Sequence, residues 1–130
     1  MRQAFRKNDV TDQRPDISIG HLGLRVSRFA ESFEFFKLVG ARVVVRMPGM
    51  AILELRGGTH VILRYDGTAD AGSAGFDLMV DDIDEMRQRL ITAGYAPKDI
   101  TRGGVHRSFT VTDPSGVEMA FTSSHAVGIV

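Results

Sequence analysis

The sequence contains no cysteine and no tryptophan among its 130 residues. The absence of cysteine excludes disulfide bonds, thiolate nucleophiles and thiolate metal ligands, and it leaves the redox compartment open. No apolar run approaches the roughly 20 residues that a membrane-spanning helix needs. The polar N-terminus also lacks the apolar segment of a secretion signal. We therefore expect a protein that does not enter membranes, with the cytoplasm as its default compartment.

A net charge is missing as well, because 16 Lys and Arg balance 16 Asp and Glu. Without a basic excess, neither nucleic acid nor an anionic membrane surface is an expected partner. The aromatic content of 8% leaves little ring surface for stacking a planar ligand. An apolar content of 43% and a length of 130 residues are ordinary for a single globular domain.

What the sequence does contain is an internal repeat. The window that begins at His21 matches, without a gap, the window that begins at Gly75. The matched pairs include Leu22 with Phe76, Leu24 with Leu78, Val26 with Val80 and Gly40 with Gly94. The offset is constant at 54 residues (75 − 21 and 94 − 40), which is the length of one supersecondary unit. The repeat predicts two modules, residues 17–66 and 75–124, between an N-terminal tail (1–16) and a C-terminal tail (125–130).

Both modules predict the element order β-α-β-β-β. In the first module, alternation predicts a strand over 17–26, and Ser27 is a suitable N-cap for a helix over 29–39. Strands are predicted over 41–47, 50–56 and 60–65. In the second module, a strand over 75–80 precedes an acidic turn (81–84) that suits a helix N-terminus. A weak strand over 95–101 and two further strands over 105–112 and 117–122 complete it.

Three motifs, in this order, resemble the vicinal oxygen chelate superfamily, which includes glyoxalase I, extradiol dioxygenases and bleomycin-resistance proteins. They are I-x-H-L-x-L-x-V at 19–26, V-D-D-I-D at 80–84 and D-P-S-G at 113–116. The resemblance covers residues 17–124. It implies an α+β fold in which two tandem β-α-β-β-β modules form a curved, mixed, eight-stranded sheet with helices on its outer face. It also implies a ligand on the concave face and a homodimer, with the modules paired within one chain or across the dimer.

The resemblance also implies one divalent metal ion, held by four positions on the concave face. Carried over to this sequence, these positions fall on His21, Gly75, Ile62 and Ala120. Only His21 offers a ligand atom, whereas a useful site needs three or four nitrogen or oxygen ligands. We therefore expect that the metal centre has been lost and that the protein has no cofactor.

A displaced metal site is the alternative. Asp77 and Glu118 each lie one pleat, about 6.6–7 Å, from a lost ligand position. With His21 and His60 they would form a set suited to Zn, Fe, Mn or Ni. This set predicts a metal-dependent lyase or dioxygenase-type enzyme in which Asp77 or Glu118 is the catalytic base.

Arginines within the predicted strands favour a different use of the concave face. A guanidinium on a sheet needs water, a carboxylate or an anionic ligand. The leading hypothesis is therefore a protein, similar to the bleomycin-resistance proteins, that binds a small polar or anionic organic molecule without a metal. The predicted ligand-binding residues are His21, Arg25, His60, Arg64, Asp77, Arg107 and Glu118. A third hypothesis is a non-catalytic dimerisation module whose sheet binds no small molecule.

Overall fold

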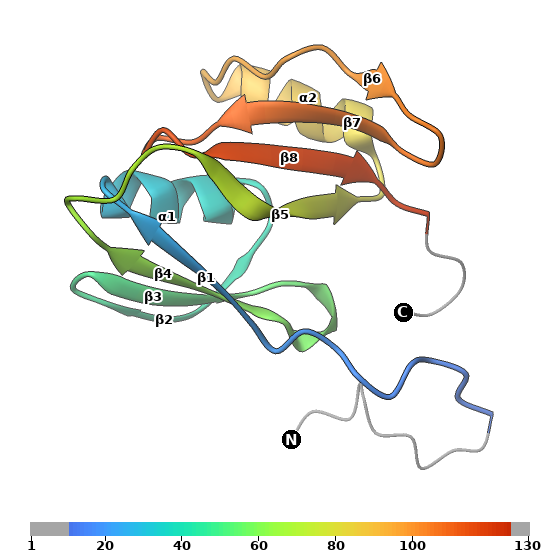
Figure 1. The fold of residues 1–130 in the computed structure, drawn as a ribbon, viewed down its shortest axis with the longest axis horizontal. Helices are drawn as coiled ribbons and strands as arrows, with labels where there is room; N and C mark the ends of the chain where they lie inside the picture. The colour runs from blue at the N-terminus through green and yellow to red at the C-terminus, as the bar shows by residue number, and fades with distance from the viewer. Residues whose placement is uncertain (1–10, 126–130) are drawn as a thin grey trace.

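The computed structural model describes residues 11–125, which fold into two consecutive β-α-β-β-β modules (Figure 1). The first contains β1 (His21–Val26), α1 (Phe29–Leu38), β2 (Arg42–Met47), β3 (Met50–Glu54) and β4 (His60–Tyr65), with a 3₁₀ turn at Arg56–Gly58. The second contains β5 (Ser73–Val80), α2 (Ile83–Thr92), β6 (Thr101–Arg102), β7 (Arg107–Thr112) and β8 (Glu118–Ser123). The predicted α+β class and element order are confirmed.

Several element boundaries differ from the prediction by one or two residues, and two strands differ by more. The first strand begins at His21 rather than at residue 17, and residues 11–20 lead away from the domain (Figure 1). This segment is tied to the domain near its end, where the Thr59 hydroxyl donates to the Ile19 carbonyl at 2.6 Å. The weak strand predicted over 95–101 shrinks to the two residues of β6. The predicted tails at 1–10 and 126–130 lie outside the described residues.

The eight strands form two four-stranded sheets within one chain. Their orders are β1-β4-β3-β2 and β5-β8-β7-β6, with β1 parallel to β4 and β5 parallel to β8. The two modules therefore repeat the same topology, as the sequence repeat predicts. In each sheet the first strand of its module, β1 or β5, lies at an edge. No helix among the described residues is long and apolar enough to cross a membrane.

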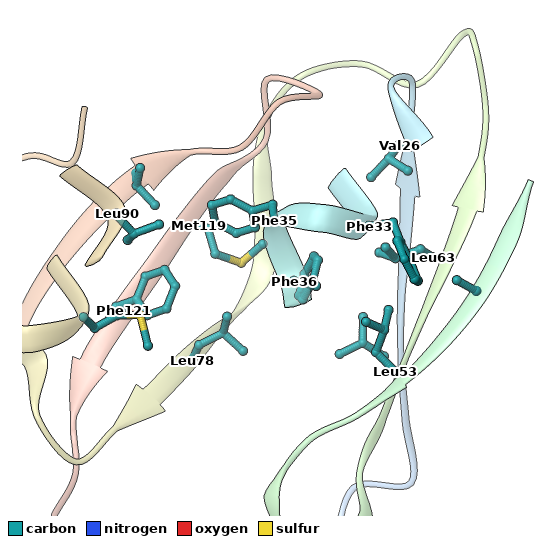
Figure 2. Packing of buried hydrophobic residues seen from close by; sticks show 14 of the residues in the cluster. Val26, Phe33, Phe35, Phe36, Leu53, Leu63, Leu78, Leu90, Met119 and Phe121 are labelled. Atoms are coloured by element: carbon teal, nitrogen blue, oxygen red, sulfur yellow. The ribbon is translucent and has the colours of Figure 1, made fainter. Parts of the chain in front are cut away.

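Helix α1 joins the two modules through its aromatic residues. Figure 2 shows Phe33 near Val26 and Leu63 of the first sheet, whereas Phe35 lies near Met119 of the second. The Phe35 ring also meets the Tyr95 ring edge-on, with centroids 5.3 Å apart. The buried apolar residues of both modules belong to one cluster. The single core therefore fixes the two sheets relative to each other.

The start of α1 is capped by the other module. The expectation that Ser27 is the N-cap is wrong, since Arg28 occupies that position and its side chain makes no capping bond. Instead, the Arg28 backbone N–H donates to the Ser115 hydroxyl at 3.0 Å. The buried Ser32 hydroxyl donates to Asp113 Oδ2 at 2.6 Å and lies 2.6 Å from Ser115 Oγ. The D-P-S-G turn therefore holds the N-terminal turn of α1 as well as the start of β8.

Each sheet has one face packed on the core and one open face. In β4, Val61 and Leu63 are fully buried, while His60 and Ile62, which alternate with them, are half-buried. In β8, Met119 and Phe121 are buried and Ala120 points the other way. Because successive side chains of a strand alternate between faces, the remaining residues line two surfaces that turn away from the helices. The resemblance implies one concave ligand face, whereas the single chain presents these two surfaces on separate sheets.

Candidate functional site

The open face of the first sheet, called here the first open face, carries its side chains in three rows across the strands. The strand registers define the rows, because residues directly opposite each other point to the same side of a sheet. From one end of the sheet to the other, the rows differ in chemistry: imidazole and ion pair, then apolar, then guanidinium and thioether.

The imidazole row contains His21, His60, Glu54 and Arg42, in strand order β1-β4-β3-β2. The His21 and His60 ring centroids lie 5.9 Å apart, with their planes inclined by 35°. Arg42 donates to Glu54 at 2.6 Å, so the two charges at the far end of the row compensate each other. The predicted pairing of His21 with His60 on one face is therefore present.

The apolar row contains Gly23, Ile62, Ile52 and Val45. The two isoleucines are half-buried and Val45 is exposed, although all three lie on the open side of the sheet. Gly23 contributes no side chain, so the row is open at its β1 end. An apolar strip with a notch at one edge thus crosses the middle of the first open face.

The arginine row contains Arg25, Arg64, Met50 and Met47. Arg25 is 76% exposed and forms a long ion pair, 3.5 Å, with Asp66. The Thr68 hydroxyl and N–H, together with Arg25, hold the pKa of Asp66 below its usual value. Arg64 is exposed and, among residues 11–125, its guanidinium has no hydrogen bond or ion pair with another residue.

The open face of the second sheet is rich in hydroxyl groups. Asp77 lies beside Ala120, and its carboxylate accepts a hydrogen bond from Thr122 at 2.9 Å. Glu118 lies at the start of β8, where it forms a long ion pair with Lys98 at 3.9 Å. This face also includes Ser108, Thr110 and Thr112 of β7. Neither carboxylate belongs to the sheet that carries the two histidines.

The structure brings together four of the seven predicted ligand-binding residues, His21, Arg25, His60 and Arg64. Asp77 and Glu118 lie on the other sheet. Arg107 lies on the core-facing side of β7 and donates two 2.9 Å hydrogen bonds to Asp84 of α2. That pair lowers the pKa of Asp84 and raises the pKa of Arg107. We therefore leave Arg107 out of the candidate site.

The residues present do not fit the metal of the resembled family. His21 is the one ligand-bearing side chain among the four inherited positions, and Gly75 has a φ of 85°. A β-carbon at such a φ is strained, so the backbone itself disfavours a ligand side chain there. Among residues 11–125, no group of three or more His, Asp or Glu side chains is placed to hold a metal ion. We derive no chemical step through a metal.

A cavity of about 400 Å³ lies between the modules, and the predicted ligand residue Asp77 lines it, whereas neither histidine does. Leu22, Leu55, Leu78, Val80 and Phe121 supply most of its apolar lining. Arg56 also lines it, and this guanidinium is paired with Asp81 at 2.8 Å. The cavity borders the unpaired edge of β5. It is a gap between the modules at that edge rather than part of the first open face.

The model of the Glyoxalase/Bleomycin resistance protein/Dioxygenase superfamily matches residues 18–121, which is most of the chain. The chain belongs to this superfamily. No curated protein matches it. The family predicted from three short motifs is therefore confirmed.

Solved structures with the same fold differ in function. A lactoylglutathione lyase from Agrobacterium tumefaciens has a TM-score of 0.71 at 17% identity, over 85% of this chain and 96% of that one. A bleomycin resistance determinant encoded on transposon Tn5 has a TM-score of 0.67 at 17% identity, over 85% of this chain and 100% of that one. TnmS3, an antibiotic binding protein from a Streptomyces species, has a TM-score of 0.70 at 21% identity, over 85% of this chain and 98% of that one. At these identities the similarity shows the fold alone.

The apolar row is a part of the candidate site that the sequence pattern alone does not predict. Its signal was available: β3 reads M-A-I-L-E, with apolar residues on both faces, although only one face packs against the core. The apolar side chains on the open face of such a strand are either covered by another apolar group or exposed to water. Gly23 was placed on the correct face but was given no role.

Proposed function

We propose that this protein binds a small polar or anionic organic molecule on the first open face, without the superfamily's metal. The observation that carries the proposal is Arg64, a guanidinium in the sheet with no partner among the described residues, in register with Arg25. A guanidinium presents a planar fork of donors that suits a carboxylate or phosphate. Binding of this kind is stoichiometric recognition or sequestration and needs no catalytic group.

The names of two structural neighbours support binding over catalysis. The Tn5 protein is a bleomycin resistance determinant, and TnmS3 is an antibiotic binding protein. This chain also lacks three of the four inherited metal ligands, at Ile62, Gly75 and Ala120. A superfamily member without these ligands retains a curved, partly polar surface, which is sufficient for binding.

We propose further that the protein is a homodimer in which the free edges of β1 and β5 are covered by the partner. Leu22, Leu24, Phe76 and Val80 on these edge strands are only partly buried, although they point toward the core. An uncovered edge also leaves a row of unpaired N–H and C=O groups. Pairing the two sheets across the dimer would give the eight-stranded sheet that the sequence implies.

An enzyme with a displaced metal site remains the second candidate, because His21 and His60 lie close enough to share an ion. Within one chain the carboxylate in their row, Glu54, is paired with Arg42, and the predicted Asp77 and Glu118 belong to the other sheet. Metal analysis of protein purified without chelator separates the two. One equivalent of bound Zn, Fe, Mn or Ni per chain, lost in His60→Ala, would favour the metal-dependent enzyme. Less than one equivalent of metal per chain would rule out the displaced metal site.

A thermal-shift screen with small organic acids, alcohols and amides tests the proposal. We expect saturable stabilisation by at least one class of acid, since a ligand at 100 times its Kd stabilises by about 2.7 kcal/mol. The shift should be lost in Arg64→Gln and kept in Arg102→Gln, a control that removes an equally exposed arginine from the other sheet. No stabilising compound across the set would instead favour the non-catalytic dimerisation module.

A further inference from the structure

Resting on the proposed function, we infer that the ligand is an elongated monocarboxylic acid with an apolar middle and an uncharged hydrogen-bonding end. Its carboxylate binds Arg25 and Arg64, its apolar middle lies in the notch at Gly23, and its far end reaches His21 and His60. Three independent features of the first open face carry this assignment: the notch, the spacing of the rows and the charge of each row.

The notch is the first feature, because the fold gives no reason for a glycine at position 23. Its φ is not positive, and a β-carbon added there would meet no atom within 4 Å. Glycine in the interior of a strand weakens the sheet and marks a place where another molecule approaches the backbone closely. A side chain at this position would project over the first open face, between His21 and Arg25. Its absence opens the middle of that face to a ligand.

The apolar row continues the notch into the sheet. Ile62 is directly opposite Gly23, and Ile52 is directly opposite Ile62. Both side chains are only half-buried, on the side of the sheet that faces away from the described helices. Branched aliphatic side chains side by side form a flat apolar strip, which a ring or a short hydrocarbon chain would cover with release of ordered water.

The spacing of the rows sets the length of the ligand. His60 and Arg64 are four residues apart in β4, which corresponds to about 13 Å along a strand. A molecule that contacts both must therefore be about 10 Å long between its polar ends, allowing for the reach of the two side chains. A small acid such as acetate occupies one row only. A two-ring acid spans the face.

The charges of the rows set the polarity of the two ends. In the imidazole row, Arg42 and Glu54 neutralise each other at 2.6 Å, so the histidines offer hydrogen bonds without a strong net field. In the arginine row, Asp66 pairs with Arg25 at 3.5 Å, and the Arg64 guanidinium has no carboxylate partner among residues 11–125. One positive charge is left uncompensated. A single carboxylate matches it, and a dicarboxylate would place its second charge away from any cation.

The test uses four probes: 4′-hydroxybiphenyl-4-carboxylic acid, its methyl ester, the acid without the hydroxyl group, and the shorter 4-hydroxybenzoic acid. Titration calorimetry with the full chain measures Kd for each. We expect the full-length hydroxy acid to bind most tightly, the ester at least tenfold more weakly, and the two remaining acids between these limits. Equal affinity of acid and ester, or tightest binding of the shortest acid, would overturn the inference.

Gly23→Val is the decisive variant, because it fills the notch in a strand that favours β-branched residues. We expect its thermal midpoint to equal or exceed that of the wild type, while Kd for the hydroxy acid rises more than tenfold. Gly20→Val is the matched control: it lies just before β1, its β-carbon also meets nothing within 4 Å, and binding should be kept. If Gly23→Val binds the hydroxy acid with unchanged Kd, the ligand does not occupy the notch at Gly23.

The proposed function and the inferred ligand class can be disproved separately. If other acids bind in an Arg64-dependent manner but are insensitive to Gly23→Val, the ligand class inferred here is wrong and the proposed function stands. If no compound of the broad screen stabilises the protein, the proposed function is wrong and the ligand class is rejected with it.

Discussion

Ser32 shows how much a single polar residue contributes to this fold. It lies on the buried side of α1, completely inaccessible, between the carboxylate of Asp113 and the hydroxyl of Ser115. Asp113 is itself 3% exposed and accepts two further hydrogen bonds, from the N–H groups of Ser115 and Val117 at 2.9 Å. One buried carboxylate therefore organises the turn before β8 and holds α1 against it.

Replacing Ser32 by alanine should destabilise the protein by about 1–3 kcal/mol, because a buried carboxylate oxygen loses its donor. Urea unfolding followed by circular dichroism measures the change as a lower midpoint at unchanged slope. Ser27→Ala is the control: Ser27 was the sequence's candidate for capping α1, yet the cap is Arg28 and is satisfied by Ser115. An equal loss of stability in Ser32→Ala and Ser27→Ala would contradict a stabilising contact between Ser32 and the turn of the other module.

At the scale of elements, α2 is attached to its sheet by an ion pair as well as by its apolar face. Ile83, Met86 and Leu90 are buried against the sheet. At the N-terminus of the helix, Asp82 accepts from the Glu85 N–H at 3.0 Å, as the acidic turn predicts. Asp84, one residue into the helix, accepts both hydrogen bonds of Arg107 from β7. A residue proposed from the sequence for ligand binding thus serves to dock a helix.

This ion pair should make stability depend on pH in the acid range. The hydrogen bonds from Arg107 hold the pKa of Asp84 below its ordinary value of 3.8 in the folded protein. Between the folded and unfolded pKa values the unfolded chain binds more protons, so stability rises with pH there. The contribution is present above about pH 4 and is lost as the pH falls through the folded pKa.

Arg107→Gln should therefore flatten the fall of the thermal midpoint below pH 4 and lower the midpoint slightly at pH 7, since the pair is exposed. Thermal melts at intervals between pH 2.5 and 7 measure the slope. Arg102→Gln is the matched control, because Arg102 is directly opposite Arg107 in the β6–β7 hairpin and is exposed. Identical acid slopes for the two variants would show that the Asp84 pair does not contribute.

At the scale of the whole molecule, one core unites two modules whose sheets do not pair within the chain. Figure 1 shows the two sheets as separate layers, with α1 between them. The open faces of the two sheets are consequently separate in the single chain. The proposed dimer would bring the first open face of one chain beside the second open face of its partner.

Met79→Pro should weaken this dimer about tenfold or more. The Glu118 and Ser124 N–H groups donate to the Gly72 and Val80 carbonyls, so the backbone of Val80 faces β8 and that of Met79 faces the free edge. Proline is tolerated at an edge but cannot donate to a partner strand. Sedimentation equilibrium measures the change in dimer Kd.

Met79→Thr, which keeps the N–H, is the control for this variant and should dimerise like the wild type. A wild-type protein that stays monomeric across the concentration range would overturn the dimer proposal. A proline variant with wild-type affinity would show that the dimer uses another surface.

The sequence by itself determined the fold, because the local patterns and the repeat agree. The 54-residue offset, the alternation of Leu22, Leu24 and Val26, and the acidic turn before α2 all survive in the structure. Where the sequence went wrong, a contact from the other module had replaced a local one. Ser27 was a reasonable cap by its neighbours, but Ser115, 87 positions away from Arg28, supplies the bond.

The site was decided by tertiary structure. The sequence could place His21 and His60 on one face, since strand alternation is local. It could not place Asp77 and Glu118 on a different sheet or turn Arg107 toward α2, because these outcomes depend on which strands pair. The strand registers likewise created the apolar row from β1, β4, β3 and β2. Alternation tells which residues share a face of one strand, and only the folded chain shows which strands share a sheet.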